Sequence, residues 1–186
     1  MGQKDTYDEA LIVEQLHHQE TVNAAFGKVI EHYSQPLYWQ IRRMVIDHDD
    51  ANDVLQNTFI KAWSNIGSFR GDAKFSTWLY KIAVNESITF INKKKVQNNI
   101  SLDDDSSFLT SNLEADRYFD GDEALLKLQK AIATLPDKQR LVFNMRYYDE
   151  MKYEDMSEIL GTSVGALKAS YHHAVKKIES FFGEED

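Results

Sequence analysis

The spacing of hydrophobic and polar residues predicts α-helices along most of the chain. In residues 21–45, apolar side chains recur every three or four positions and would form one stripe along a helix: Val22, Phe26, Val29, Ile30 and Tyr33. Residues 47–66 show a second stripe, preceded by aspartates of the kind that cap helices. A third long helix is expected in residues 77–95, after a glycine-containing loop. These segments predict one compact helical unit.

The pattern changes after residue 95. Residues 96–122 are rich in Asn, Ser and Asp, and their few apolar side chains have no regular spacing. Helical spacing returns at Glu123 and continues through several shorter segments, one of which ends at Pro136. We therefore expect an all-α fold of two small domains. The predicted boundaries are an N-terminal helical domain at 1–95, an acidic flexible linker at 96–122 and a C-terminal helix-turn-helix domain at 123–186.

Composition narrows the class of protein. The 186 residues are 42% hydrophobic, with two prolines and no cysteine. The absence of cysteine excludes disulfides and thiolate metal sites. The sequence has no window of about 18 apolar residues, so no membrane span is expected. The N-terminus also lacks the apolar segment of a secretory signal. We expect a cytoplasmic protein without a cofactor.

Charge is distributed unevenly, although the formal total is −9. Residues 70–95 hold six basic and two acidic side chains, a net charge of +4. Residues 96–123 hold one basic and eight acidic side chains, a net charge of −7. The acidity is thus concentrated between two other segments, and the basic segment before it also contains aromatic residues, which suits single-stranded DNA.

Residues 153–178 have the pattern of a helix-turn-helix. Gly161 can adopt the left-handed turn, and Ser163 can cap the second helix. Packing of the apolar positions would leave one face outward: Gly165, Ala166, Lys168, Ala169, His172 and Lys176. Small residues at the start of such a face let a helix lie deep in the major groove of DNA. On spacing alone, a plain helical hairpin with a solvated lysine face remains an alternative.

Several longer motifs together resemble one family. They are "DANDVLQNTFIKAW", "FRGDAKFSTWLYKIAVN" and "LPDKQRLVFNMRYYDEMKYEDMSEILGTSVGALK", in this order. The chain resembles the extracytoplasmic-function sigma factors, the small two-domain promoter-specificity subunits of bacterial RNA polymerase, over about residues 20–95 and 123–182. The resemblance implies core RNA polymerase and promoter DNA as partners, an anti-sigma factor as a further partner, and no enzymatic activity.

The resemblance also implies three sets of site residues. The clamp of the largest polymerase subunit would be met by Asp53, Gln56, Asn57, Ile60 and Trp63. The −10 element, with one base flipped out of the stack, would be met by Phe69, Arg70, Asp72, Ala73, Lys74, Lys81, Asn85 and Thr89. The −35 element would be met by Arg146, Ser163, Gly165, Ala166, Lys168, Ala169, His172, His173 and Lys176. Among the aromatic and apolar residues nearby, we expect Phe75, Trp78 and Leu79 to be core, whereas Phe69 and Asn85 are expected to act on DNA.

Other functions fit the sequence less well. A stand-alone helix-turn-helix regulator with an N-terminal sensor or partner-binding domain would leave the basic, aromatic first unit unexplained. An enzyme is not indicated, because no nucleophile and base are found in a recognisable arrangement. His172 and His173 do not indicate a metal site, because neighbours on a helix point about 100° apart.

We predict that the two units can be separated by cleavage between about residues 98 and 121, because this segment has no periodic apolar face to bury. Limited proteolysis followed by mass spectrometry of the first fragments tests this. First cuts within either helical unit would contradict the proposed boundary.

Overall fold

A computed structural model describes residues 7–97 and 123–183, and within these ranges the chain forms helices and no strand. This confirms the predicted all-α fold. A single 3-10 turn spans Ile66–Ser68. The α-helices are α1 Glu9–Leu16, α2 Val22–Val45, α3 His48–Asn65, α4 Phe75–Gln97, α6 Glu123–Ala133, α7 Asp137–Tyr147, α8 Tyr153–Leu160 and α9 Val164–Gly183. The predicted linker, apart from its first two residues in α4, lies outside the described residues.

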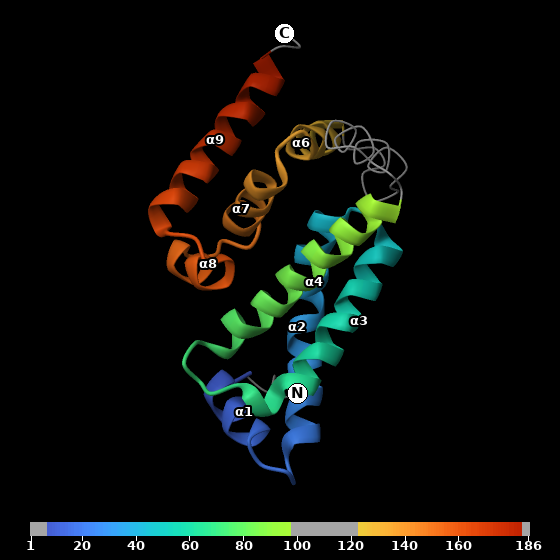
Figure 1. The fold of residues 1–186 in the computed structure, drawn as a ribbon, viewed down its shortest axis with the longest axis vertical. Helices are drawn as coiled ribbons and strands as arrows, with labels where there is room; N and C mark the ends of the chain where they lie inside the picture. The colour runs from blue at the N-terminus through green and yellow to red at the C-terminus, as the bar shows by residue number, and fades with distance from the viewer. Residues whose placement is uncertain (1–6, 98–122, 184–186) are drawn as a thin grey trace, which may run out of the picture.

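The first unit is a bundle in which α2, α3 and α4 lie side by side and α1 covers one end (Figure 1). Its core is closed by fully buried side chains from all three long helices, among them Leu37, Val54 and Leu79. α3 begins where the sequence pattern predicts it. The Asp47 carboxylate caps this helix by accepting hydrogen bonds from the backbone N–H groups of Asp49 and Asp50, at 2.9 and 3.0 Å.

The second unit consists of α6–α9 and contains the predicted helix-turn-helix. Gly161 ends α8 with a φ of +61°, which is a left-handed conformation that favours glycine. The Ser163 hydroxyl oxygen caps α9 by accepting from the backbone N–H of Ala166, at 3.3 Å. Leu167, one turn into α9, is fully buried and fixes the angle of this helix.

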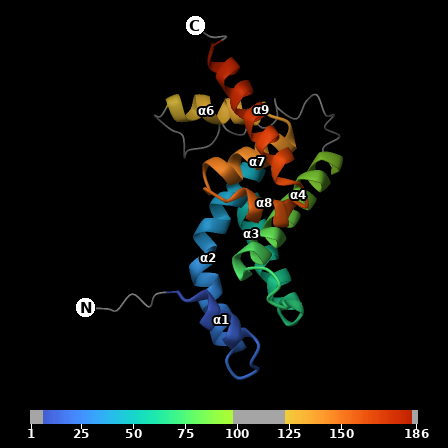
Figure 2. The same ribbon diagram turned by 90° about the vertical axis from the view of Figure 1, so that its left-hand side faces the viewer.

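The two units pack directly against each other. Figures 1 and 2 show α7 and α8 resting beside α4, near the C-terminal end of α2. We call this contact the seam; it joins residues 43–46 and 74–95 of the first unit to residues 126–162 of the second. α9 projects away from the bundle, so the C-terminal end of α9 and α1 lie at opposite ends of the molecule. Across the described ranges, none of the helices is both long and apolar enough to span a membrane.

Candidate nucleic-acid and polymerase interface

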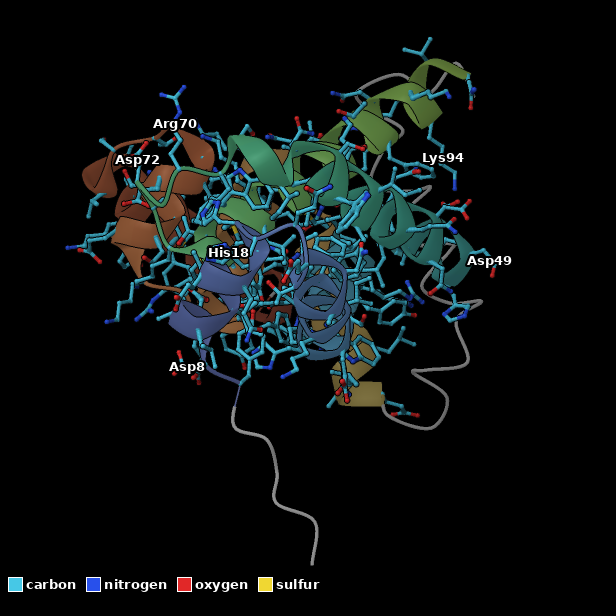
Figure 3. The ribbon with its side chains drawn as sticks, turned by 90° about the horizontal axis from the view of Figure 1, so that it is seen from below. Asp8, His18, Asp49, Arg70, Asp72 and Lys94 are labelled. Carbon is cyan, nitrogen blue, oxygen red and sulfur yellow. The ribbon has the colours of Figure 1, made fainter. Side chains whose placement is uncertain are left out.

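The loop before α4 presents most of the residues predicted for the −10 element. Arg70, Asp72 and Lys74 are exposed, and Ala73 is half-buried. Gly71 turns the loop with a φ of +79°. Figure 3 shows Arg70 and Asp72 projecting outward from this loop, at the opposite end of the first unit from Lys94 and Asp49. The loop therefore offers a cation, an anion and accessible backbone within a few residues.

The structure corrects the expectation for Phe69. Its side chain is only 5% exposed and packs on the rings of Phe75 and Trp78, with centroid distances of 5.3 Å to each. His17, at the end of α1, stacks over it with ring centroids 6.5 Å apart. Setting Phe69 apart from the core was thus wrong: it is part of the aromatic core that holds the loop. Phe75 and Leu79 are buried and Trp78 is half-buried, as expected.

Helix α4 continues the surface begun by the loop. Lys81, Asn85 and Thr89 are exposed and lie one turn apart along the helix. The Thr89 hydroxyl donates to the backbone oxygen of Asn85, at 2.7 Å. The side-chain amide of Asn85 makes no hydrogen bond within the described part of the chain and is available to the edge of a base.

The residues predicted to meet polymerase share the exposed face of α3. Asp53, Gln56 and Asn57 are exposed, and the large apolar side chains of Ile60 and Trp63 are 57% and 41% exposed. The three polar residues also line a groove of about 410 Å³ whose other wall is the C-terminal part of α4, with Phe90, Lys93, Lys94 and Gln97. Sequence reasoning did not find this second wall. An apolar centre beside polar anchors is the composition of a protein–protein interface.

The residues predicted for the −35 element lie along α9 and its N-terminus. All of the following are exposed: Ser163, Gly165, Ala166, Lys168, Ala169, His172, His173 and Lys176. The opposite side of α9 is buried through Leu167, Ala174 and Ile178. α9 therefore has one buried face and one continuous exposed face.

Arg146, the remaining residue of this set, is engaged within the protein. Its guanidinium donates to the backbone oxygen of Met151, at 3.1 Å, and lies 5.2 Å from the centre of the Tyr153 ring. The Lys168 ammonium lies 5.7 Å from the same ring. Tyr153 thus links the two cations across α7 and α9 through cation–π contacts. The sequence analysis missed this role, because Tyr153 differs in no visible way from an ordinary packing residue.

A buried ion pair lies behind these surfaces, in the seam. Arg43 Nη1 and Asp149 Oδ1 are 3.2 Å apart, with side chains 18% and 10% exposed. Burial raises the pKa of the Asp149 carboxyl to about 6, and the positive charge of Arg43 offsets only part of this. Burial, together with the negative charge of Asp149, also raises the pKa of the Tyr80 hydroxyl to about 12.

Comparison with known families matches both units. Residues 29–96 match Sigma-70 region 2, and residues 125–178 match Sigma-70, region 4. The chain is 35% identical over 156 residues to the ECF RNA polymerase sigma factor SigW of Bacillus subtilis, covering 80% of this chain and 83% of that protein. It is 28% identical to the RNA polymerase sigma-H factor of Pseudomonas aeruginosa, covering 83% and 84% of the two chains.

Two solved structures share the fold. CnrH, in complex with the cytosolic domain of CnrY, superposes with a TM-score of 0.70 at 19% identity, over 96% of this chain and 99% of that one. The sigma factor RpoE of Bartonella quintana, in complex with the anti-sigma factor NepR, superposes with a TM-score of 0.66 at 21% identity, over 85% and 96% of the two chains. At this identity the likeness concerns the fold.

The raised pKa of Asp149 predicts a specific dependence of stability on pH. Between about pH 4 and 6 the folded chain holds a proton on Asp149 that the unfolded chain has released, so this contribution to stability is lost as pH rises through 6. Compared with Asp149→Asn, the wild-type chain should lose about 1 kcal/mol of unfolding free energy between pH 5 and pH 7. Urea denaturation of both proteins at these pH values measures the difference. A difference that does not change with pH would contradict the raised pKa.

Proposed function

The chain belongs to the extracytoplasmic-function sigma factors of the sigma-70 family, and we propose how its three exposed surfaces divide the work of promoter recognition. As a sigma factor it binds core RNA polymerase and directs transcription initiation at promoters. The observation that carries the proposal is the exposure of Ile60 and Trp63 beside polar residues on α3.

In this proposal α3 docks on the polymerase clamp. Ile60 and Trp63 provide the apolar centre of the contact, and Asp53, Gln56 and Asn57 provide the surrounding polar anchors. Because α3 and α4 pack on each other, docking α3 also orients the DNA-facing side of α4. The polymerase contact therefore sets the position of the −10 surface.

The loop 70–74 and the exposed side of α4 receive the −10 element. Removing a base from the stack costs a few kcal/mol, which contacts to the base must recover. The amide of Asn85 can both donate to and accept from a base edge, while Arg70, Lys74 and Lys81 face the phosphates. The buried Phe69 gives the loop a rigid base.

The exposed face of α9 enters the major groove at the −35 element. Gly165, Ala166 and Ala169 permit close approach, and Lys168 and Lys176 contact the backbone or base edges. We assign Arg146 mainly to holding the loop between α7 and α8, through Met151 and Tyr153.

An anti-sigma factor is a further partner of this chain. The two structures that share its fold were solved with CnrY and with NepR, the latter an anti-sigma factor. The exposed surfaces needed for DNA and polymerase are the ones that such an inhibitor must cover or displace.

The proposal predicts that tight promoter binding requires core polymerase. The reading helix carries only Lys168, Lys176 and Lys177 as cations, and the chain as a whole has a charge of −9, so phosphate neutralisation by the free protein is small. Binding to a labelled promoter fragment at about 0.15 M salt should be weak for the free protein and tight with core enzyme. Tight, sequence-specific binding by the free protein would instead favour the stand-alone regulator.

Asn85→Ala should impair promoter opening without loss of stability, because the Asn85 side chain is exposed and unbonded within the protein. Loss of one good base contact is worth about 1–3 kcal/mol, a fall of about 5- to 150-fold in transcription from a duplex promoter. The defect should be smaller on a template melted in advance at −10, where no base has to be extracted.

The matched control for this prediction is Asn23→Ala, which removes the same amide from an exposed position on α2. Thermal unfolding of all three proteins completes the test. If Asn85→Ala lowers stability as much as it lowers activity, or if Asn23→Ala has the same effect on transcription, the role of Asn85 in the −10 pocket is wrong.

A further inference from the structure

The first helix packs on the aromatic residue that anchors the −10 loop. α1 lies outside the match to Sigma-70 region 2, which begins at residue 29. Its buried side chains Ile12 and Leu16 belong to the same apolar cluster as Phe69, the residue that directly precedes the exposed loop 70–74. At the end of α1, the ring of His17 lies nearly parallel to the ring of Phe69, at an interplanar angle of 8°. α1 thus contributes to the packing beneath this loop.

The pictures place α1 and the loop together. In Figure 1 both lie at the same end of the first unit. Figure 3 looks onto this end and labels His18, which follows His17 in the turn after α1, together with Arg70 and Asp72 of the loop. The contact between the rings therefore joins two neighbouring segments that are about 50 positions apart in the sequence.

α1 is fixed to the bundle at both of its ends. At its start, the Tyr33 hydroxyl of α2 donates to the Glu9 carboxylate, at 2.8 Å. At its end, the Thr21 hydroxyl donates to the backbone oxygen of Gln15, at 2.7 Å, and closes the turn between α1 and α2. The backbone around His17 is therefore held on both sides, and its ring is kept over Phe69 by the fold of this segment.

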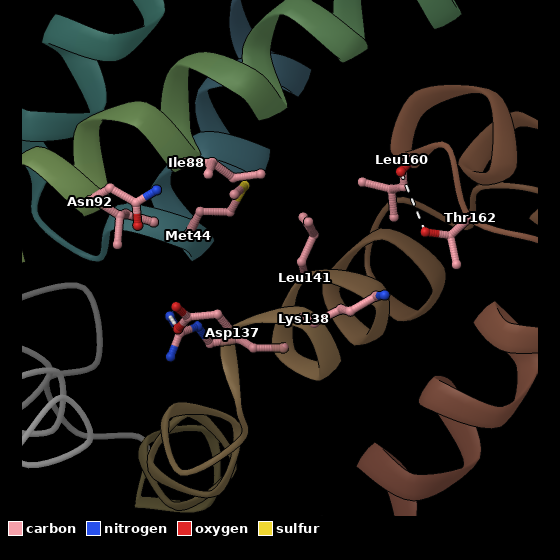
Figure 4. A pocket seen from close by; sticks show the side chains of 10 residues that line it. Met44, Ile88, Asn92, Asp137, Lys138, Leu141, Leu160 and Thr162 are labelled. Atoms are coloured by element: carbon pink, nitrogen blue, oxygen red, sulfur yellow. Dashed lines mark hydrogen bonds and ion pairs between the residues drawn. The ribbon is translucent and has the colours of Figure 1, made fainter. Parts of the chain in front are cut away.

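The second unit supports a different part of α4. Towards the C-terminal half of this helix, Ile88 faces Leu141 across a cavity of about 300 Å³ (Figure 4). The loop itself meets the second unit through Lys74 and Asp155, whose charged atoms are 3.4 Å apart and whose side chains are 62% and 26% exposed. Exposed ion pairs of this kind contribute little to stability. The loop is therefore held mainly through Phe69 and the residues that pack on it.

The charge of the α1 segment decides between contacting DNA and supporting the loop. Residues 7–21 contain four acidic side chains and no lysine or arginine. Surfaces that bind the nucleic-acid backbone are basic, because they neutralise phosphates. This segment is therefore unsuited to binding the strand, whereas the ring of His17 can stabilise the loop through Phe69.

A base that leaves the stack must find its contacts already in place. A loop that becomes ordered only when the base arrives loses conformational entropy at that step, and this loss slows promoter opening. An aromatic contact that already exists in the free protein removes part of this cost.

We propose that α1 is part of the −10 recognition surface and that His17 is a positioning residue, whose ring holds Phe69 and thereby keeps loop 70–74 in the conformation that receives the flipped base. The effect on promoter opening rests on the proposed function of the loop. The effect on the rigidity of the loop can be measured in the free protein.

The first test measures the loop in the free, full-length protein. Arg70 is an exposed trypsin site in the loop, and cleavage there requires the loop to leave its folded conformation. In His17→Ala, the initial rate of cleavage after Arg70, followed by mass spectrometry, should rise about 2- to 10-fold through loss of one aromatic contact. Cleavage after Lys177, on α9, should keep its wild-type rate. His18→Ala, at the exposed neighbouring position, is the matched control and should leave both rates unchanged.

The second test measures promoter opening by the complex with core polymerase. A fluorescent label in the −10 region of a duplex promoter reports the rate constant of opening when the complex is saturating. His17→Ala should lower this rate constant about 2- to 10-fold and leave the affinity for core polymerase unchanged. His17→Phe, which keeps an aromatic ring beside Phe69, should restore most of the rate. His18→Ala should open the promoter like the wild type.

Several results would overturn the proposal. In His17→Ala, cleavage after Arg70 could remain unchanged, or cleavage after Lys177 could rise equally, which would indicate a loss of global stability in place of a local role. Equal opening rates for His17→Ala and His18→Ala, or no recovery in His17→Phe, would also contradict it. A failure of the proposed function looks different: the wild-type protein would then not open promoter DNA with core enzyme, while cleavage after Arg70 would still report whether His17 holds the loop.

Discussion

The burial of α4 between α2 and α3 is the constraint on which the other features depend. Phe75, Leu79 and Val84 are at most 1% exposed, so this helix cannot rotate without opening the core. Successive residues of a helix are about 100° apart, and α4 therefore has further sides with fixed directions. One exposes Lys81, Asn85 and Thr89, and the adjoining side, with Ile88 and Ile91, faces the second unit. A single packing event thus positions the −10 surface and the docking face for the helix-turn-helix.

The net charge of the chain does not describe the charge of its individual surfaces. The excess of acidic residues coexists with exposed lysines and arginines on the −10 loop, α4 and α9. Two of these cations already have partners within the protein: Lys74 pairs with Asp155, and Lys168 lies over the Tyr153 ring. Exposed pairs of this kind contribute little to stability, so DNA phosphates can replace them at small cost.

The seam differs from these surface pairs because its central contacts are buried. Removing one partner of the Arg43–Asp149 pair would leave an uncompensated buried charge. Met44, Leu141 and Ile46 add apolar surface to the seam, each at most 8% exposed.

The sequence by itself determined the helices, the turn at Gly161, the cap at Ser163 and the exposed face of α9, because these depend on local spacing and on the conformational preferences of single residues. The exposed set on α3 was implied by the resemblance to the family and not by spacing. Only the tertiary structure decided that Phe69 is core, since Phe75 and Trp78 of α4 and His17 at the end of α1 converge on it. Only the tertiary structure showed that Arg146 contacts Met151 and Tyr153. It also showed that Arg43 pairs with Asp149, more than one hundred positions away. Periodicity states which side of a helix is apolar, but the partner of that side is chosen by the packing of the whole chain.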